Sequence, residues 1–448
     1  MDHALPDDAF VPPTDAPGAV VVGLSGGLDS TVLLHRLARQ PGFRDRGLRA
    51  LHVHHGLHPD ADAWALHCAR LCAELGVALD VHRVDVARDS GLGPEAAARA
   101  ARHAAFAAGL GTGDILALAH HLDDQAETFL LRALRASGPD GLAAMRPWRR
   151  FAGGWMWRPL LGTPRAALRA WAERHGLAWI EDPANADPAH DRSVLRHQVL
   201  PLLRARWPGA AAALARSAAL CGDAADLLAA EDAAVLDALL AAPAGAAAED
   251  AADGAPSHTR SLSAAALRAL PAPRRARVLR AWISGQGLPP LPGSAMATVE
   301  RMLDARDDAL TEYRWSGAAL RRWRGQLHAM PLRPPPPRDW LLHWDGRTPL
   351  PLPAGGRLLL EGAPAFERPL HVHARRGGER MQLPGRGHTH ALKHLLQDAG
   401  VPPWKRAYIP LLSAPGGGLL AAGDRLLSAR FHDWLEARGA RLHWQDMA

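Results

Sequence analysis

The segment that most constrains the fold of this chain is residues 18–37, GAVVVGLSGGLDSTVLLHRL. It begins with a short apolar run typical of a buried parallel strand, turns through SGGLDS, and continues with apolar residues at helical spacing. A strand, a glycine turn and a helix in this order direct backbone N–H groups and the positive helix end towards an anion. The residues expected to hold phosphate are Ser25, Gly26, Gly27, Leu28, Asp29 and Ser30.

Each residue type in this loop suits phosphate binding. Gly26 and Gly27 allow backbone conformations closed to other residues and let the chain approach a phosphate closely. Asp29 offers a carboxylate to a metal ion carried by the phosphate, and the hydroxyls of Ser25 and Ser30 can donate hydrogen bonds. A lone Gly-Gly is more often a simple turn, but the complete string after a strand favours a phosphate site.

The loop is not of the Walker type, because no lysine follows its glycines. SGGLDS after a strand instead resembles the PP-loop of the ATP pyrophosphatases, which cleave ATP between its α- and β-phosphates. The resemblance implies that ATP activates a substrate, and it leaves the substrate open.

Strands and helices alternate after the loop. Strands are expected at residues 48–54, 79–84 and 115–119, and helices at 61–75, 94–108 and from Asp123 onwards. This alternation predicts βαβ units and an α/β fold with a doubly wound, Rossmann-like parallel sheet. Because ligands of such sheets bind at the carboxyl ends of the strands, functional residues should follow strands.

A second polar group follows the strand at 115–119, in the string AHHLDDQAET. At helical spacing, His120, Asp124 and Glu127 share one helix face. A capped helix start would account for one or two of these polar residues, but not for all of them. Carboxylates beside imidazoles can bind Mg²⁺ and supply a general base. We therefore expect these three residues to be catalytic, with Asp29 and Asp124 as ligands of Mg²⁺.

Composition narrows the class of protein. The net charge of +6 permits a polyanionic partner, and the chain contains two lysines, Lys393 and Lys405, where arginine has replaced lysine almost everywhere else. Three cysteines argue against a disulfide framework and fit a reducing cytosol. No apolar run is long enough to span a membrane, and residues 1–10 lack the features of a signal peptide, so we expect a cytoplasmic protein.

The histidines of HVHHGL, residues 52–57, stand without carboxylate or cysteine at ligand spacing, which favours a cleft lining over a metal site.

Several strings resemble the tRNA(Ile)-lysidine synthase family. Residues 119–145 are similar to its A-H-H-x-D-D-Q-x-E-T-x-L-x-R-x-x-R-G-S-G motif, with Ala136 in place of a glycine. Residues 157–161, WRPLL, match its R-P-L-L. Residues 182–201 keep the motif arginines Arg192 and Arg196 but carry Ser193 for an asparagine. Residues 376–405 are similar to the family's C-terminal R-x-G-G-E-R and V-P-P-W strings and include both lysines.

The resemblance implies a reaction. ATP adenylates O2 of the wobble cytidine in the CAU anticodon of tRNA(Ile), and the ε-amino group of free L-lysine then attacks C2 and displaces AMP. ATP, Mg²⁺, this tRNA and lysine are therefore the expected cofactors and partners. Arg99, Arg192 and Arg196 are expected to contact the activated base, AMP or tRNA phosphates, although arginines at this spacing also form solvated helix faces. A homodimer is compatible with the sequence, which does not define the oligomeric state.

Two other readings stay open. A PP-loop enzyme that thiolates tRNA would commonly carry a C-x-x-C pair, whereas Cys68 and Cys72 lie four residues apart in an expected helix and Cys221 is distant in the chain. A non-catalytic RNA-binding protein with a decayed nucleotide fold would not be expected to keep both polar strings intact.

Four regions are expected along the chain. Residues 1–208 form the PP-loop catalytic domain, 209–330 a helical domain that binds tRNA or substrate, 331–348 a proline-rich linker, and 349–448 a small α+β domain that binds tRNA. Within the second region, residues 242–257 are of low complexity and are expected to form a loop or linker.

Overall fold

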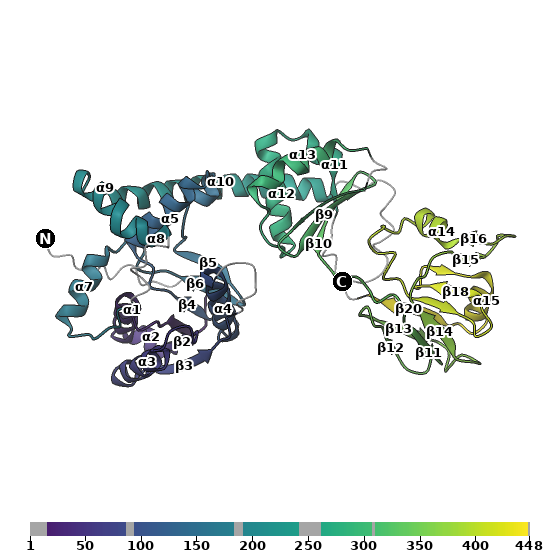
Figure 1. Cartoon of the computed structure of the whole chain (residues 1–448), viewed down its shortest axis with the longest axis horizontal. Coiled ribbons are helices and arrows are strands. Elements are labelled where there is room, and N and C mark those ends of the chain that lie inside the picture. The colour runs from purple at the N-terminus through teal and green to yellow at the C-terminus, as the bar shows by residue number, and fades with distance from the viewer. Residues whose placement is uncertain (1–15, 87–93, 183–190, 242–260, 307–309, 447–448) are drawn as a thin grey trace. The chain divides into compact units, whose positions relative to one another are not determined.

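The computed structural model describes residues 16–86, 94–182, 191–241, 261–306 and 310–446 (Figure 1). The chain divides into two compact units, Met1–Ala230 and Glu231–Ala448, and each is described by itself. The low-complexity segment 242–257 lies outside the described residues. Among the helices of the described ranges, none is both long and apolar enough to cross a membrane.

The first unit is built on a six-stranded sheet with the strand order β3-β2-β1-β4-β6-β5. Its strands are β1 (Val20–Gly23), β2 (Arg49–His54), β3 (Ala78–Arg83), β4 (Ile115–Ala117), β5 (Trp148–Phe151) and β6 (Gly154–Trp157). All neighbours are parallel except β5 and β6. Val21 of β1 pairs with Arg49 on one side and with Leu116 on the other. The strand order therefore reverses at β1, which is where ligands bind in such sheets.

Helices flank this sheet, and the expected doubly wound α/β fold is confirmed. The helices of this part of the chain are α1 (Leu28–Ala38), α2 (Pro41–Asp45), α3 (Ala61–Leu75), α4 (Pro94–Ala108), α5 (Leu122–Leu134), α6 (Pro139–Leu142), α7 (Arg165–Arg174), α8 (Asp191–Val194), the π-helix η3 (Leu195–Val199), α9 (Leu200–Arg206) and α10 (Ala210–Ala241). Helices α5, α9 and α10 share a separate small core, and α10 continues past the end of the first unit. On one face, Val22 of β1 belongs to a core with Leu33 of α1 and Leu168 of α7. On the other face, Val21 packs in a core with Phe106 of α4. Successive strand residues thus serve opposite faces.

The second unit begins with helices and an antiparallel sheet. The expected helices are present as α11 (Ala264–Ala269), α12 (Ala272–Gly285) and α13 (Met296–Asp304), with the short η5 (Gly293–Ala295) before the last. They pack on a four-stranded sheet of β7 (Leu262–Ser263), β10 (Gln326–Pro331), β9 (Ala318–Trp323) and β8 (Thr311–Trp315). This sheet was not expected from the amino-acid sequence. Its strands are short, and β9 reads AALRRW, which lacks the alternation that identifies a half-buried strand.

The rest of the second unit is α+β, as expected. Five antiparallel strands lie in the order β11 (Leu341–Trp344), β14 (Leu370–His373), β17 (Leu411–Ser413), β18 (Leu419–Ala422) and β19 (Leu426–Leu427). The smaller sheets are formed by β12 (Leu350–Pro351), β13 (Arg357–Glu361) and β20 (Arg441–Gln445), and by β15 (Arg380–Met381) and β16 (His390–Ala391). Two helices, α14 (Leu392–Asp398) and α15 (Ala429–Glu436), accompany them. β11 lies within residues 331–348, the range for which a linker was expected.

Candidate active site

The loop between β1 and α1 is braced by a distant segment. Gly26 has φ +82°, a conformation that side chains disfavour, and a Cβ atom there would lie 2.6 Å from Cδ1 of Ile180. The carbonyl of Gly26 accepts a hydrogen bond of 2.9 Å from the Ile180 amide, and Gly27 forms a parallel β-bridge with the same residue. The segment after α7 therefore braces the loop in a conformation that requires glycine at residue 26.

The serines of the loop have different surroundings. Ser30 is buried; its Oγ donates to the Gly27 carbonyl at 3.1 Å and accepts from the Ser25 amide at 3.2 Å. Ser25 is exposed, with its Oγ 3.0 Å from that of Ser30. Ser30 thus maintains the loop, while the hydroxyl of Ser25 is presented to solvent.

Helix α1 begins without a side-chain cap. Gly27 is its N-cap residue, and the first backbone bond runs from the Thr31 amide to the Gly27 carbonyl at 3.0 Å. The amides that precede this bond, at residues 28–30, are those that lack intrahelical partners at any helix start. Together with the helix dipole these amides are suited to an anion, and phosphate binding at this helix end stays a prediction.

His121 joins this loop to helix α5. It is the N-cap residue of α5, where its Nδ1 accepts from the Asp124 amide and the Asp124 carboxylate accepts from the His121 amide at 3.1 Å. Its Nε2 lies 3.7 Å from Oδ2 of Asp29 and 3.4 Å from Oδ2 of Asp124. The buried imidazole therefore stands between the two carboxylates expected to bind metal.

Asp29 has an oxygen that lacks a partner. Its Oδ1 is buried and accepts no hydrogen bond from any described residue. Burial raises the pKa of Asp29, and the nearby charge of Asp124 raises it further against the opposing effects of His121 and Arg165. An orphaned carboxylate oxygen at a phosphate-binding loop is a suitable ligand for Mg²⁺, which needs one or two carboxylates beside phosphate and water. Within the described ranges, no group of three His, Cys, Asp or Glu side chains gathers to hold a metal ion.

Asp124 and Glu127 are joined through one arginine. Arg196 of η3 donates to both oxygens of Glu127, at 2.7 and 3.0 Å, and to Oδ1 of Asp124 at 2.8 Å. Glu127 is fully buried, and burial raises its pKa against the influence of Arg196. Burial also opposes ionisation of Asp124, but His121, His120 and Arg196 together lower its pKa. Asp124, whose side chain keeps 13% of its surface, is therefore the carboxylate of this pair that a substrate can reach.

The remaining predicted residues lie in two places. Arg192 of α8 donates to Oγ1 of Thr128 at 3.0 Å, and this hydroxyl donates to the Asp124 carbonyl at 2.7 Å, so Arg192 borders the carboxylate network. Arg99 is exposed on α4, near His103, whose pKa is lowered to about 4 by burial and then by Arg99. The structure thus brings together Asp29, His120, Asp124, Glu127, Arg192 and Arg196, and places Arg99 on the neighbouring surface of α4.

Sequence reasoning missed several contacts of this site. Arg165, the first residue of α7, has its Nε 3.8 Å from Oδ1 of Asp29, and this Nε is buried without a hydrogen bond to any described residue. The Arg165 amide donates to Asp123 at 2.9 Å, and Asp123 forms an ion pair with Arg204 of α9. No local spacing identifies these residues, because their partners are 42 to 136 positions away along the chain. The available signal in the sequence was the pair of adjacent carboxylates, Asp123 and Asp124, which indicates nearby cationic partners.

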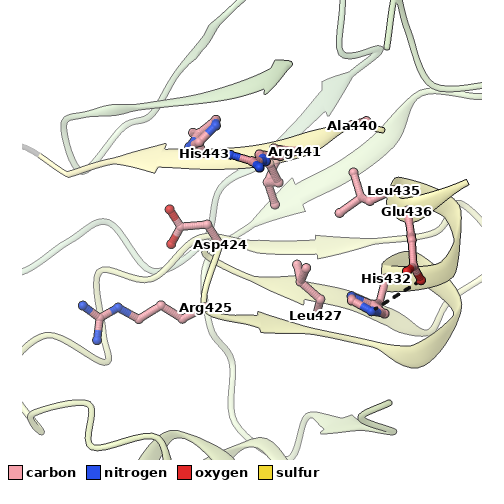
Figure 2. Close-up of a pocket in the computed structure, with 10 residues that line it drawn as sticks. Asp424, Arg425, Leu427, His432, Leu435, Glu436, Ala440, Arg441 and His443 are labelled. Carbon is pink, nitrogen blue, oxygen red and sulfur yellow. Dashed lines mark ion pairs between the residues drawn. The ribbon is translucent and has the colours of Figure 1, made fainter. Parts of the chain in front are cut away.

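A cavity of about 370 Å³ lies elsewhere, in the second unit (Figure 2). Side chains from the turn before β19, from α15 and from β20 line it. Its charged groups are mixed: Asp424 and Glu436 stand among Arg425 and Arg441, and His432 pairs with Glu436 at 3.9 Å. It contains none of the predicted catalytic residues and does not favour an anionic ligand.

Three family models match the chain: the PP-loop domain over residues 7–203, the TilS substrate binding domain over 262–328 and the TilS substrate C-terminal domain over 370–444. A tRNA(Ile)-lysidine synthase from Xanthomonas campestris pv. campestris is 55% identical over 439 residues, 97% of each chain. The chain belongs to the tRNA(Ile)-lysidine synthase family. Relatives of the same name come from Xylella fastidiosa, with 54% identity over 95% of each chain, and from Pseudomonas aeruginosa, with 45% identity over 88% of this chain and 87% of the relative.

This lysidine synthase family member departs from the motif at the end of α5. Ala136 has φ +52°, in the left-handed region that favours glycine. Its amide donates to the Ala133 carbonyl and the Ser137 amide donates to the Arg132 carbonyl, which is the Schellman arrangement. The family's glycine thus has a physical reason, and alanine retains the same turn with backbone strain.

Proposed function

We propose that this chain is a tRNA(Ile)-lysidine synthase, which uses ATP to convert the wobble cytidine of the CAU anticodon into lysidine. Its membership of the family, over nearly the full length of relatives that carry this name, is the observation that carries the proposal. The anion-binding start of α1 and the carboxylates beside it supply the chemistry that the first step needs. The tRNA substrate makes the cytoplasm the place of action.

In the first step, O2 of the cytidine attacks the α-phosphorus of ATP and pyrophosphate leaves. The uncapped amides of α1 and the hydroxyl of Ser25 would hold the phosphates. Asp29, with its orphaned oxygen, would hold Mg²⁺; Asp124 would be a second ligand through the lone pairs left free by Arg196 and His121. The bound ion would supply charge neutralisation for the leaving pyrophosphate.

In the second step, the ε-amino group of lysine attacks C2, and the bond from C2 to the adenylated oxygen breaks to release AMP. The amine must lose a proton before or during the attack. Asp124 and His120 border the site from which it would be positioned, and Glu127 contributes by holding Arg196 against Asp124. Arg192, Arg196 and the exposed Arg99 would face the AMP or the tRNA phosphates.

The remaining expectations extend this proposal to the whole chain. Residues 209–330 and 349–448 would bind the tRNA, joined by residues 331–348, and the matched substrate-binding models support this assignment. A homodimer remains an expectation that light scattering can test. Sulfur transfer is disfavoured, because burial raises the pKa of the Cys68 thiol to about 12 and that of Cys72 to about 11, which leaves both poor nucleophiles.

The test is incorporation of radiolabelled lysine into a tRNA(Ile) transcript with a CAU anticodon, in the presence of ATP and Mg²⁺. A methionine tRNA transcript with the same anticodon is the control. Labelling of the first transcript alone supports the proposal, and Asp124→Ala should abolish it while the fold is retained. Labelling of neither transcript, with ATP and lysine in excess, would refute it.

A further inference from the structure

Arg158 is a buried arginine that the reaction above does not use. It follows β6, its surface is 7% exposed, and its N–H groups donate to three acceptors. Its Nη1 donates to the Arg146 carbonyl at 2.8 Å and its Nη2 contacts Sδ of Met156 at 2.9 Å. Its Nε donates to Nδ1 of His120 at 3.2 Å. The guanidinium is therefore held in place and directs one N–H at the ring of His120.

This bond determines where the proton of His120 sits. A guanidinium has only donors, so Nδ1 must offer its lone pair and the neutral ring must carry its proton on Nε2. A second proton could only go onto Nδ1, where it would break the bond and place an imidazolium beside a cation. Among the described residues, no hydrogen bond involves Nε2 of His120, so this N–H remains available.

The charges around the ring act in the same direction. Burial is the largest cause that lowers the pKa of His120, to about 3, and Arg158, Arg192 and Arg102 lower it too, against the single opposing carboxylate of Asp124. A group that stays neutral and has its lone pair occupied cannot take a proton from an amine. It can donate a hydrogen bond, as a neutral histidine does when it polarises an oxygen in other enzymes.

We propose that His120 acts as a neutral hydrogen-bond donor through Nε2, and that Arg158 is the positioning residue that enforces this tautomer. The acceptor is an oxygen of the reacting groups, on the α-phosphoryl group or the cytidine. The inference rests on the proposed function for its catalytic meaning, and it assigns removal of the lysine proton to Asp124 in place of His120.

The first test is spectroscopic and independent of activity. In protein labelled with ¹⁵N-histidine, the His120 signals, assigned by their loss in His120→Gln, should show a bare Nδ1 and a protonated Nε2 from pH 7.5 down to pH 5.5. In Arg158→Met the lone pair of Nδ1 is released, so part of the His120 proton should move from Nε2 to Nδ1 while the ring stays neutral. Arg149→Met is the matched control, because Arg149 contacts the same Met156 sulfur, at 3.3 Å, but not His120. A proton on Nδ1 in the unaltered protein, or equal spectra for the two variants, would overturn the proposal.

The second test separates a donor from a base. Glutamine can place an N–H near the position of Nε2 but cannot accept a proton, whereas alanine does neither. Loss of a preorganised donor costs about 100- to 1000-fold in kcat. His120→Ala should therefore lose about that much, and His120→Gln should recover at least about 10-fold of it. Equal losses in both would identify His120 as a base. Arg158→Lys, which keeps a donor, should retain more activity than Arg158→Met, and thermal unfolding of each variant checks that the fold persists. Failure of the unaltered protein to label tRNA would refute the proposed function and leave the spectroscopic result standing.

Discussion

Replacing Arg196 by methionine removes the cation that holds both oxygens of the fully buried Glu127. Breaking a buried ion pair from one side costs about 3–5 kcal/mol, because the remaining charge is left without compensation. For a unit of this size, 1 kcal/mol corresponds to about 2–4 °C in melting temperature. The first unit of Arg196→Met should therefore melt about 6–20 °C lower at pH 7.5, as followed by calorimetry.

The pH dependence gives this prediction its sign. The pKa of Glu127 lies above its ordinary 4.5, chiefly because of burial, so between the two values the folded protein binds more protons than the unfolded chain. Stability attributable to Glu127 therefore falls as the pH rises through this window. Without Arg196 the pKa of Glu127 rises further, and the pH range in which the folded protein binds more protons than the unfolded chain extends upwards. The loss of stability in Arg196→Met should therefore be largest near pH 7.5 and smaller towards pH 5.

Two variants complete the experiment. Glu127→Gln combined with Arg196→Met removes the buried charge and should recover part of the lost stability at pH 7.5. Arg192→Met is the matched control, since Arg192 lies nearby but donates to a neutral hydroxyl, and its loss should cost about 1 kcal/mol. A deficit below about 1 kcal/mol for Arg196→Met, or one that does not change with pH, would refute the reasoning from buried charge.

Three further predictions concern the loops and helix ends around the site. Gly26→Ala should lower the free energy of unfolding by about 2–3 kcal/mol, measured by urea unfolding, and weaken ATP binding, measured by calorimetric titration. Gly27→Ala, at φ −74°, should lower the free energy of unfolding by less than about 1 kcal/mol. Equal losses in the two variants would contradict the role of the Ile180 contact. Arg165→Met should raise the KM for ATP about 10-fold or more, while Arg169→Met, on the same helix and 45% exposed against 42%, should leave it unchanged. Ala136→Gly should raise the free energy of unfolding by about 0.5–1 kcal/mol, and a decrease would show that its positive φ carries no strain.

Local sequence patterns predicted those helices and strands whose apolar residues recur at a regular spacing. Helix α3 occupies residues 61–75 as expected, because its apolar spacing and the following Gly76, at φ +62°, mark both its face and its end. Asp124 and Glu127 lie on α5, as the helical spacing predicted, but the shared helix face was wrong for His120, which precedes the N-cap residue His121. The His120 side chain nevertheless lies near Asp124. Their individual catalytic roles remain predictions.

Contacts between distant parts of the chain could not be predicted in this way. Arg196 pairs with Glu127, 69 positions away along the chain, and Arg158 contacts His120, 38 positions away. No local sequence pattern predicts either separation. Arg196 was expected to face a ligand, and in the structure its donors are also committed to two carboxylates. The strand β9 was missed because two consecutive arginines interrupt its pattern, although one of them, Arg322, is 5% exposed.

The bare start of α1 has a thermodynamic consequence. With glycine as its N-cap residue, α1 forgoes roughly a few tenths of a kcal/mol that a serine or aspartate side chain would give. A bound phosphate would accept from the same amides and restore this contribution, so nucleotide binding and the folding of the first helix become linked equilibria. The unliganded chain is then less stable than its sequence could make it, and saturating nucleotide should slow amide hydrogen exchange in the first turn of α1 more than at the centre of the sheet.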